Sequence, residues 1–313
     1  MVNRVLIRVK VIQILFACSK HEMPSLKEVS DELERSIEQS YKLYHYMLSL
    51  MGAITDLHAQ RLDQAQSKYM PSEEERNPNL RMVNNRFIAT LMANTSLNDY
   101  CEKNGVTWAE SRDIVRIMLN EILSSQIYAD YLASDDCFDT DKLFWRACFK
   151  EIIAKSEEME NELEEMSIYW NDDAEVINTF VIKTIKRIQS TTKPTDPLLP
   201  VAHNGEDIEF ANRLLHKSLV NVAEYDELID SHLKNWDSER IADMDRLILR
   251  AAIAEMIYFD SIPLTVTFNE YIDIAKSYST PKSGIFVNGI LDAVAAALKK
   301  EGRLPLAKLG SNV

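Results

Sequence analysis

Three helical patterns follow one another between residues 240 and 298. Apolar positions recur there at spacings of three and four, which is the period of an amphipathic helix. A Ser-Ile-Pro sequence at residues 261–263 separates the first pattern from the second, and a Ser-Thr-Pro sequence at residues 279–281 separates the second from the third. Because proline removes a helical hydrogen bond, we predict three short helices divided at these two points.

The same spacing extends over most of the upstream chain. A first helix is predicted at residues 2–19, and a capping box at Ser25 and Glu28 opens a long one that runs to about residue 68. Further helical patterns cover residues 80–94, 107–128, 139–152, 176–189 and 207–232. The acidic stretch 151–175 is interpreted as a solvated helix, with a docking face for a basic partner as the alternative.

Composition supports an all-α fold class. The 313 residues include only 7 glycines, and the long stretches between the breaks are rich in helix formers. The clearest breaks are the polar segment 70–78 and the segment 190–200, which holds three prolines. A length of 313 residues is typical of about two domains.

The net charge is −14, which argues against a protein that coats nucleic acid or anionic membranes non-specifically. It allows a local basic patch and favours a basic protein partner. Four scattered cysteines without CxxC spacing are typical of reduced cytosolic thiols. The six histidines form no HxxxH or HExxH pair, so neither a metal site nor another cofactor is predicted. No secretory signal is recognised, and the cytoplasm is the expected location.

Basic residues gather in the first predicted helix. Arg4, Arg8, Lys10 and Lys20 give the first 20 residues a charge of +4. One interpretation is a solvated helix face. The other is a patch that contacts backbone phosphates, and position in the chain does not decide between them.

The C-terminal part resembles the NusB family of bacterial transcription antitermination factors. The resemblance depends on the order and spacing of these residues: Ile241, Asp245-Arg246-Leu247-Ile248-Leu249-Arg250, Glu255, Asp260-Ser261-Ile262-Pro263, Val266, Asn269-Glu270, Ile274-Ala275-Lys276 and Phe286-Val287-Asn288-Gly289-Ile290-Leu291-Asp292. It extends back over residues 210–236. The N-terminal helix is less similar, because the family's Arg-x-x-Ala-Arg-Glu is represented only by Arg4 and Arg8, followed by Gln13, Leu15 and Phe16.

The resemblance implies a division of the chain. Residues 1–66 would be N-terminal helices of a NusB-like fold, and residues 205–300 its C-terminal helical bundle. Between them, residues 67–204 would be a helical insertion with a Pro-rich return linker at 190–200, and residues 301–313 would be a tail.

The resemblance also implies candidate site residues. For RNA binding these are Arg4, Arg8, Lys10, Lys282 and Ser283. Partner-binding or structural roles fall to Asn269, Glu270, Phe286, Asn288 and Gly289. We expect Thr267 and Glu270 to form a capping box, and we expect a neighbouring helix to lie close to Gly289, because glycine inside a helix otherwise costs about 1 kcal/mol.

The function that the resemblance implies is binding and not catalysis. Proteins of this family recognise boxA-type single-stranded RNA together with the ribosomal protein NusE, and they help RNA polymerase to read through termination signals in ribosomal RNA operons. The alternative is a NusB-like scaffold that has lost most of its RNA affinity. A homodimer is kept among the partners. A methyltransferase is disfavoured, because the chain lacks GxGxxG and has few residues after Leu298.

Overall fold

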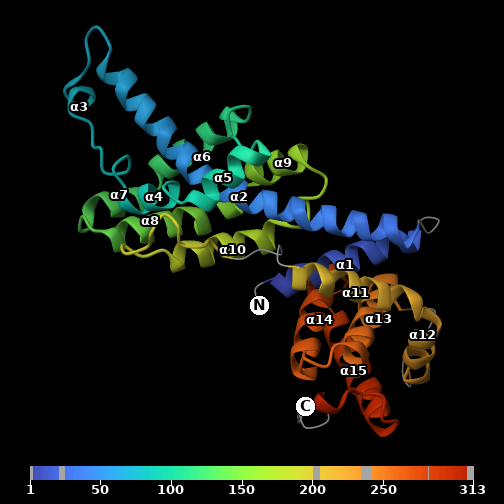
Figure 1. The fold of residues 1–313 in the computed structure, drawn as a ribbon. Coiled ribbons are helices and arrows are strands. Elements are labelled where there is room, and N and C mark those ends of the chain that lie inside the picture. The colour runs from blue at the N-terminus through green and yellow to red at the C-terminus, as the bar shows by residue number, and fades with distance from the viewer. Residues whose placement is uncertain (1–2, 21–24, 200–204, 234–240, 281, 309–313) are drawn as a thin grey trace. The chain divides into compact units, whose positions relative to one another are not determined.

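The computed structural model describes residues 3–20, 25–199, 205–233, 241–280 and 282–308. These residues form helices and turns, with no strand among them, so the predicted all-α class is confirmed (Figure 1). They divide into two compact units. Unit 1 comprises residues 1–37 and 202–313, and unit 2 comprises residues 38–201.

The boundary between the units falls inside the long helix α2, Leu26–Gln66. The sequence placed the end of the NusB-like part at residue 66, which is where α2 ends, whereas the compact units separate at residue 37. The assignment of residues 67–204 as an insertion stays a prediction.

Unit 1 consists of α1 and the start of α2, followed by helices from the last third of the chain. Their bounds are α1 Asn3–Lys20, α11 Gly205–Val220, α12 Val222–Ser231, α13 Asp243–Tyr258, α14 Leu264–Tyr278 and α15 Ser283–Lys300, with a short 3-10 turn at Leu306–Lys308. The three helices predicted between residues 240 and 298 are therefore confirmed. The predicted helix at 207–232 is interrupted, because α11 ends at Val220 and α12 begins at Val222.

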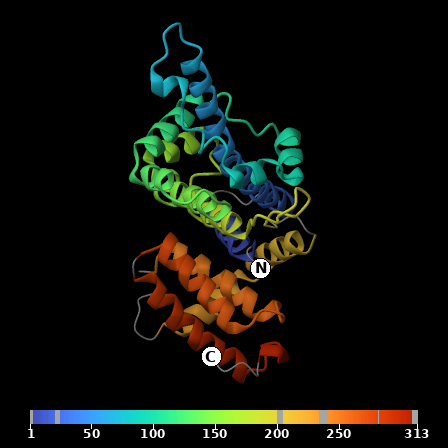
Figure 2. The ribbon, with the colours of Figure 1, turned by 90° about the vertical axis from the view of Figure 1, so that its left-hand side faces the viewer.

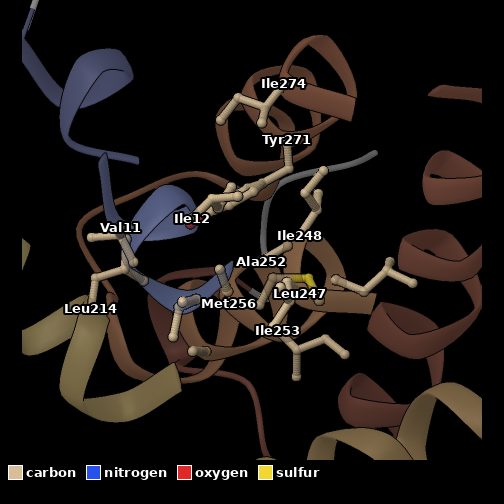
Figure 3. Close-up of a cluster of buried hydrophobic side chains, with 14 of the residues drawn as sticks. Val11, Ile12, Leu214, Leu247, Ile248, Ala252, Ile253, Met256, Tyr271 and Ile274 are labelled. Carbon is tan, nitrogen blue, oxygen red and sulfur yellow. The ribbon is translucent and has the colours of Figure 1, made fainter. Parts of the chain in front are cut away.

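Helix α13 is the centre of unit 1. It packs against α1, α11, α12, α14 and α15. Apart from Arg250, every residue from Leu247 to Met256 is buried, which is the pattern of a helix enclosed on all sides. Figure 3 shows side chains of α1, α11, α13 and α14 in one cluster, among them Val11, Leu214, Ile253, Met256 and Tyr271.

Unit 2 contains the remaining length of α2 and a set of shorter helices. Their bounds are α3 Glu73–Arg76, α4 Arg86–Met92, α5 Thr95–Asn104, α6 Arg112–Ser124, α7 Gln126–Ala133, α8 Phe138–Glu151, η1 Ile153–Lys155, α9 Glu157–Met166 and α10 Ala174–Arg187. Helix α8 packs against α4, α7 and α10. Its Trp145, Cys148 and Phe149 are fully buried in the core of the unit.

Two predicted helix starts in unit 2 are wrong. The helix predicted from residue 107 begins only at Arg112, and the Thr107 hydroxyl accepts a bond from the Ala109 amide in the turn before it. The pattern at residues 80–94 becomes a turn followed by α4, which the Asn85 side chain caps. The acidic stretch 151–175 contains a short α9 in place of one long helix.

Among the described residues, no helix is long and apolar enough to cross a membrane.

Candidate nucleic-acid interface

Helix α1 lies antiparallel to α13, and ion pairs join them near both ends. The Arg8 guanidinium donates to both carboxylate oxygens of Glu255, at 2.7 and 2.9 Å. Twelve residues further along α1, Lys20 Nζ lies 2.6 Å from the Asp243 carboxylate at the start of α13. The first pair is buried and the second is exposed, so the two ends of α1 differ in their access to solvent.

Glu255 is the hub of a buried polar cluster. Besides Arg8, its carboxylate accepts bonds from the Thr267 hydroxyl at 2.8 Å and from the Tyr271 hydroxyl at 3.3 Å. The Glu255 backbone carbonyl accepts a bond from Lys308 Nζ, which also donates to the Met256 carbonyl. A fully desolvated carboxylate needs such partners, because burying an unpaired charge is very unfavourable. The cluster thus ties α1, α13, α14 and the C-terminal turn together.

Burial and charge set the ionisation of this cluster. Burial alone would lower the pKa of Arg8, but its bonds to Glu255 raise it above the ordinary value. Burial raises the pKa of Tyr271 well above its ordinary value, and the Glu255 charge adds to the effect. Burial also raises the pKa of Glu270, whose carboxylate lies 3.8 Å from the Arg8 guanidinium. The raised pKa values keep the Arg8 guanidinium charged and the Tyr271 hydroxyl protonated inside the cluster.

The basic residues of α1 do not form a common surface patch. Arg8 and Lys10 are each 2% exposed, whereas Arg4 is half-buried. The Arg4 guanidinium lies over the Phe210 ring of α11, 4.9 Å from its centre. A phosphate could reach Arg8 only if Arg8 left Glu255, so the RNA contacts predicted for Arg8 and Lys10 stay predictions that require movement.

The start of α15 combines an exposed cation with a buried hydroxyl. Lys282 is the exposed N-cap residue of α15. Ser283 is buried; its hydroxyl donates to the Asp245 carboxylate at 2.9 Å and accepts a bond from the Thr280 amide at 3.1 Å. Ser283 therefore anchors the segment to α13 while Lys282 faces solvent.

Arg4 and Lys282 lie at opposite ends of α13. Phe210, under Arg4, packs against Phe259 just beyond the C-terminus of α13, whereas Ser283, next to Lys282, bonds to Asp245 in its first turn. A rise of 1.5 Å per residue puts these positions about 20 Å apart. The sequence grouped the two residues in one RNA-binding set, and the structure does not bring them together.

The partner or motif residues are placed in several environments. Asn269, Asn288 and Gly289 are exposed, Glu270 is half-buried and Phe286 is buried. The capping box expected from Thr267 and Glu270 is wrong: α14 already begins at Leu264, and Thr267 bonds to Glu255.

The close approach expected at Gly289 is also wrong. A Cβ atom there would meet nothing within 4 Å. The neighbouring helix instead approaches Gly284, where a Cβ atom would lie 2.9 Å from the Lys276 side chain. Gly289 therefore leaves a flat, exposed position on α15.

Ion pairs of Arg246 and Arg250 link α13 to α12. Arg250 donates to both carboxylate oxygens of Asp226 on α12, at 2.8 and 2.6 Å. Arg246 donates to Asp230 at 2.9 Å.

The sequence analysis assigned Glu255 no function of its own. Its position as an acidic residue inside the apolar run of α13 could have indicated a buried, paired carboxylate. Lys308 lies in the segment predicted to be a tail, and no sequence pattern around it indicates a buried lysine.

No group of three or more His, Cys, Asp or Glu side chains within the described ranges could hold a metal ion.

The comparisons with known proteins agree on one family. The NusB family model matches residues 177–296, which run from α10 through most of α15. The match therefore begins inside the stretch that the sequence analysis assigned to an insertion. No solved structure matches the chain.

Curated relatives of the chain carry the name transcription antitermination protein NusB. The protein of Salinibacter ruber is 38% identical over 130 residues, which cover 40% of this chain and 81% of the relative. That of Geobacillus kaustophilus is 42% identical over 108 residues, covering 34% of this chain and 83% of the relative. That of Chloroherpeton thalassium is 44% identical over 96 residues, covering 31% of this chain and 46% of the relative. With more than four fifths of two relatives covered at such identity, this chain belongs to the NusB family.

Proposed function

We propose that the chain is a transcription antitermination factor that binds boxA-type single-stranded RNA together with NusE and promotes read-through by RNA polymerase in ribosomal RNA operons. The observation that carries this proposal is the similarity to relatives named transcription antitermination protein NusB over most of their length. The family match covers residues 177–296, which include the candidate RNA contact Lys282 but not Arg4.

The start of α15 is the favoured contact point for RNA phosphates. Lys282 is exposed, and it lies where the amides of a helix N-terminus also favour an anion. The Ser283–Asp245 bond fixes the backbone of this segment to α13, so the cation is presented from a rigid base. Single-stranded RNA leaves its phosphates and unstacked bases free for such contacts.

NusE enters the proposal as the protein partner. The net charge of −14 would disfavour extended non-specific contacts with RNA and would suit a basic ribosomal protein. A joint complex would then gain its RNA specificity from both proteins.

The test is a binding titration of the full chain with a boxA RNA and a scrambled RNA, with and without NusE, over a series of salt concentrations. We expect a preference for boxA that increases with NusE, and an affinity that falls as salt is raised. Equal binding of both RNAs under every condition would overturn the proposal.

Replacement of Lys282 by alanine sharpens this test. Loss of one phosphate contact should lower the slope of log affinity against log salt by about one. Lys299→Ala is the matched control, because Lys299 is an exposed lysine in the last turn of the same helix. If both variants lower the slope equally, a local contact at Lys282 is excluded.

A second candidate function is a NusB-like scaffold with little RNA affinity. The burial of Arg8 and Lys10 favours it, because two of the four cations of α1 are withdrawn from solvent. It predicts that the chain binds NusE but does not distinguish boxA from the scrambled RNA.

A further inference from the structure

The segment between the end of α2 at Gln66 and the start of α3 at Glu73 forms a turn, called the tip below, that several side-chain bonds stabilise. Both views show this turn extending away from the other helices of unit 2 (Figures 1 and 2). Gln66 donates to the Arg76 carbonyl at 3.2 Å, and Lys68 pairs with Glu75 across the turn. Ser72 and Glu75 form a reciprocal capping box. These bonds hold the tip in one conformation, which lowers the entropy lost when it binds a partner.

The tip carries two apolar side chains without cover in unit 2. Tyr69 is 100% exposed and Met70 is 81% exposed. Tyrosine and methionine are enriched where proteins bind one another, and tyrosine buries a large area at low entropic cost. Glu73 and Glu74 come after Pro71 and Ser72 and are exposed, so acidic side chains flank the two apolar ones.

Unit 2 also contains a cavity of about 270 Å³. It lies between α4, the last turn of α10 and the Pro-rich segment that follows. Its apolar wall includes Leu91, Ile188, Leu198 and Leu199, and Thr90 and Thr192 contribute hydroxyl groups. A mixed wall of this kind suits a side chain that is apolar along its length and polar at its end, such as tyrosine.

The Pro-rich segment is fixed where it walls the cavity. The Asn94 amide donates to the Asp196 carbonyl at 2.9 Å, and the Thr95 amide donates to the Pro194 carbonyl at 2.9 Å. Asn94 is itself buried and caps α5. These hydrogen bonds fix the wall of the cavity that the Pro-rich segment forms.

The rim of the cavity has the charge opposite to that of the tip. Arg187 lines it, while Lys193 follows the lining residue Thr192 and Lys186 precedes Arg187. All three cations are exposed, and within the described ranges the structure gives none of them an ion pair. This local excess of cations stands out in a unit with 27 acidic and 17 basic residues. Asp196 is the acidic residue among the lining residues.

We propose that two copies of this chain pair through unit 2, each inserting Tyr69 and Met70 into the other's cavity. Glu73 and Glu74 of one copy would then face Arg187 and its neighbouring cations on the other. Each copy carries both the tip and the cavity, so one contact is repeated by two-fold symmetry and the pair closes on itself. A single tip buries too little surface for a stable interface, but the reciprocal contact doubles the area and gives a reversible dimer.

The experiment is sedimentation velocity of the full chain over a range of concentrations up to several hundred micromolar. We expect a monomer–dimer equilibrium. Tyr69→Ala combined with Met70→Ser should weaken it by about tenfold or more, and neither change touches the core. Ile168→Ser is the control, since Ile168 is an equally exposed apolar residue of unit 2. A monomer at every concentration, or a dimer that the tip variant leaves unchanged, would overturn the proposal.

A charge exchange tests the orientation of the pair. Glu74→Lys and Arg187→Glu should each weaken the dimer, because each places like charges opposite one another. The double variant restores opposite charges and should recover most of the wild-type affinity. Failure of the double variant to recover, with circular dichroism showing it folded, would exclude this docking arrangement.

Discussion

Each unit contains a buried carboxylate hub, and the two hubs differ in where their cation lies. In unit 1, Glu255 is paired with Arg8, and both side chains are almost completely buried. In unit 2, Asp141 accepts bonds from the Tyr131 hydroxyl at 2.8 Å and the Arg86 amide at 2.9 Å. Its cation, the Arg86 guanidinium, is 48% exposed and also pairs with Asp136.

The comparison separates two consequences of a buried charge. When both partners of an ion pair are buried, removal of one leaves the other as an unpaired charge in the protein interior, where it is poorly solvated. When the cation is at the surface, water and a second carboxylate can take over. The two hubs should therefore respond differently to the same kind of substitution, although both carboxylates are buried.

The largest effect is expected from Glu255→Gln. The variant keeps the shape of the side chain but leaves Arg8 without its bidentate partner, with Glu270 only at 3.8 Å. We expect a loss of about 3–5 kcal/mol in the free energy of unfolding, measured by urea denaturation. Combining it with Arg8→Met should cost less than the sum of the two single variants. Strict additivity would show that the two side chains do not act as a pair.

Asp141→Asn should have a smaller effect. The asparagine oxygen can accept only one of the two bonds, because the Tyr131 hydroxyl binds Oδ1 of Asp141 and the Arg86 amide binds Oδ2, but the Arg86 guanidinium retains Asp136 and solvent. We expect a loss of about 1–3 kcal/mol in the same assay. A loss equal to that of Glu255→Gln would break the comparison, because it would mean that exposure of the cation does not matter.

The pH dependence of Lys308 probes the unit 1 hub from its other side. Burial lowers the pKa of Lys308 from 10.5 in the unfolded chain to about 8 in the folded protein. Between these values the unfolded chain binds more protons, so stability rises with pH. Against Lys308→Met, the unfolding free energy of the wild type should therefore climb from pH 8 to pH 10.5 and stay level below pH 8. A difference that is flat across this range would contradict the burial of the ammonium group.

The smallest effect concerns glycines in the two units. Gly289→Ala should stabilise unit 1 by about 0.5–1 kcal/mol, because the position is helical, exposed and open. Gly52→Ala in α2 should destabilise unit 2, because a Cβ atom there would overlap the Met92 sulfur. Thermal denaturation of both variants measures whether each change raises or lowers the stability of the protein. A destabilising Gly289→Ala would indicate an additional requirement for glycine at this site.

Sequence alone located the helices best where local chemistry ends them. Pro263 and the break before Ser283 separate α13, α14 and α15, because a proline acts on its own neighbours wherever the chain goes. The same holds for the length of α2, which has no proline between Leu26 and Gln66. The helix start predicted at residue 107 was wrong because the Thr107 hydroxyl accepts a bond from the Ala109 amide in a local turn and does not cap a helix.

The candidate site was harder to predict, because its chemistry depends on distant partners. Nothing near Arg8 in the chain indicates that it will be buried, since Glu255 is 247 positions away. Gly289 and Gly284 lie in the same helix, and only the crossing of α14 and α15 decides which one a neighbour approaches. Lys282 could be recognised as exposed because it follows a proline and precedes a helix.

The antiparallel pairing of α1 with α13 also has a consequence during synthesis of the chain. Helix α1 leaves the ribosome first, but Glu255 is added 247 residues after Arg8, roughly 12–50 s later at about 5–20 residues per second. The residues of unit 2 are contiguous and are complete before α13 is made. A nascent chain that stops short of Glu255 would therefore carry a finished unit 2 and could pack α1 only against α11, with Arg8 still without its carboxylate partner.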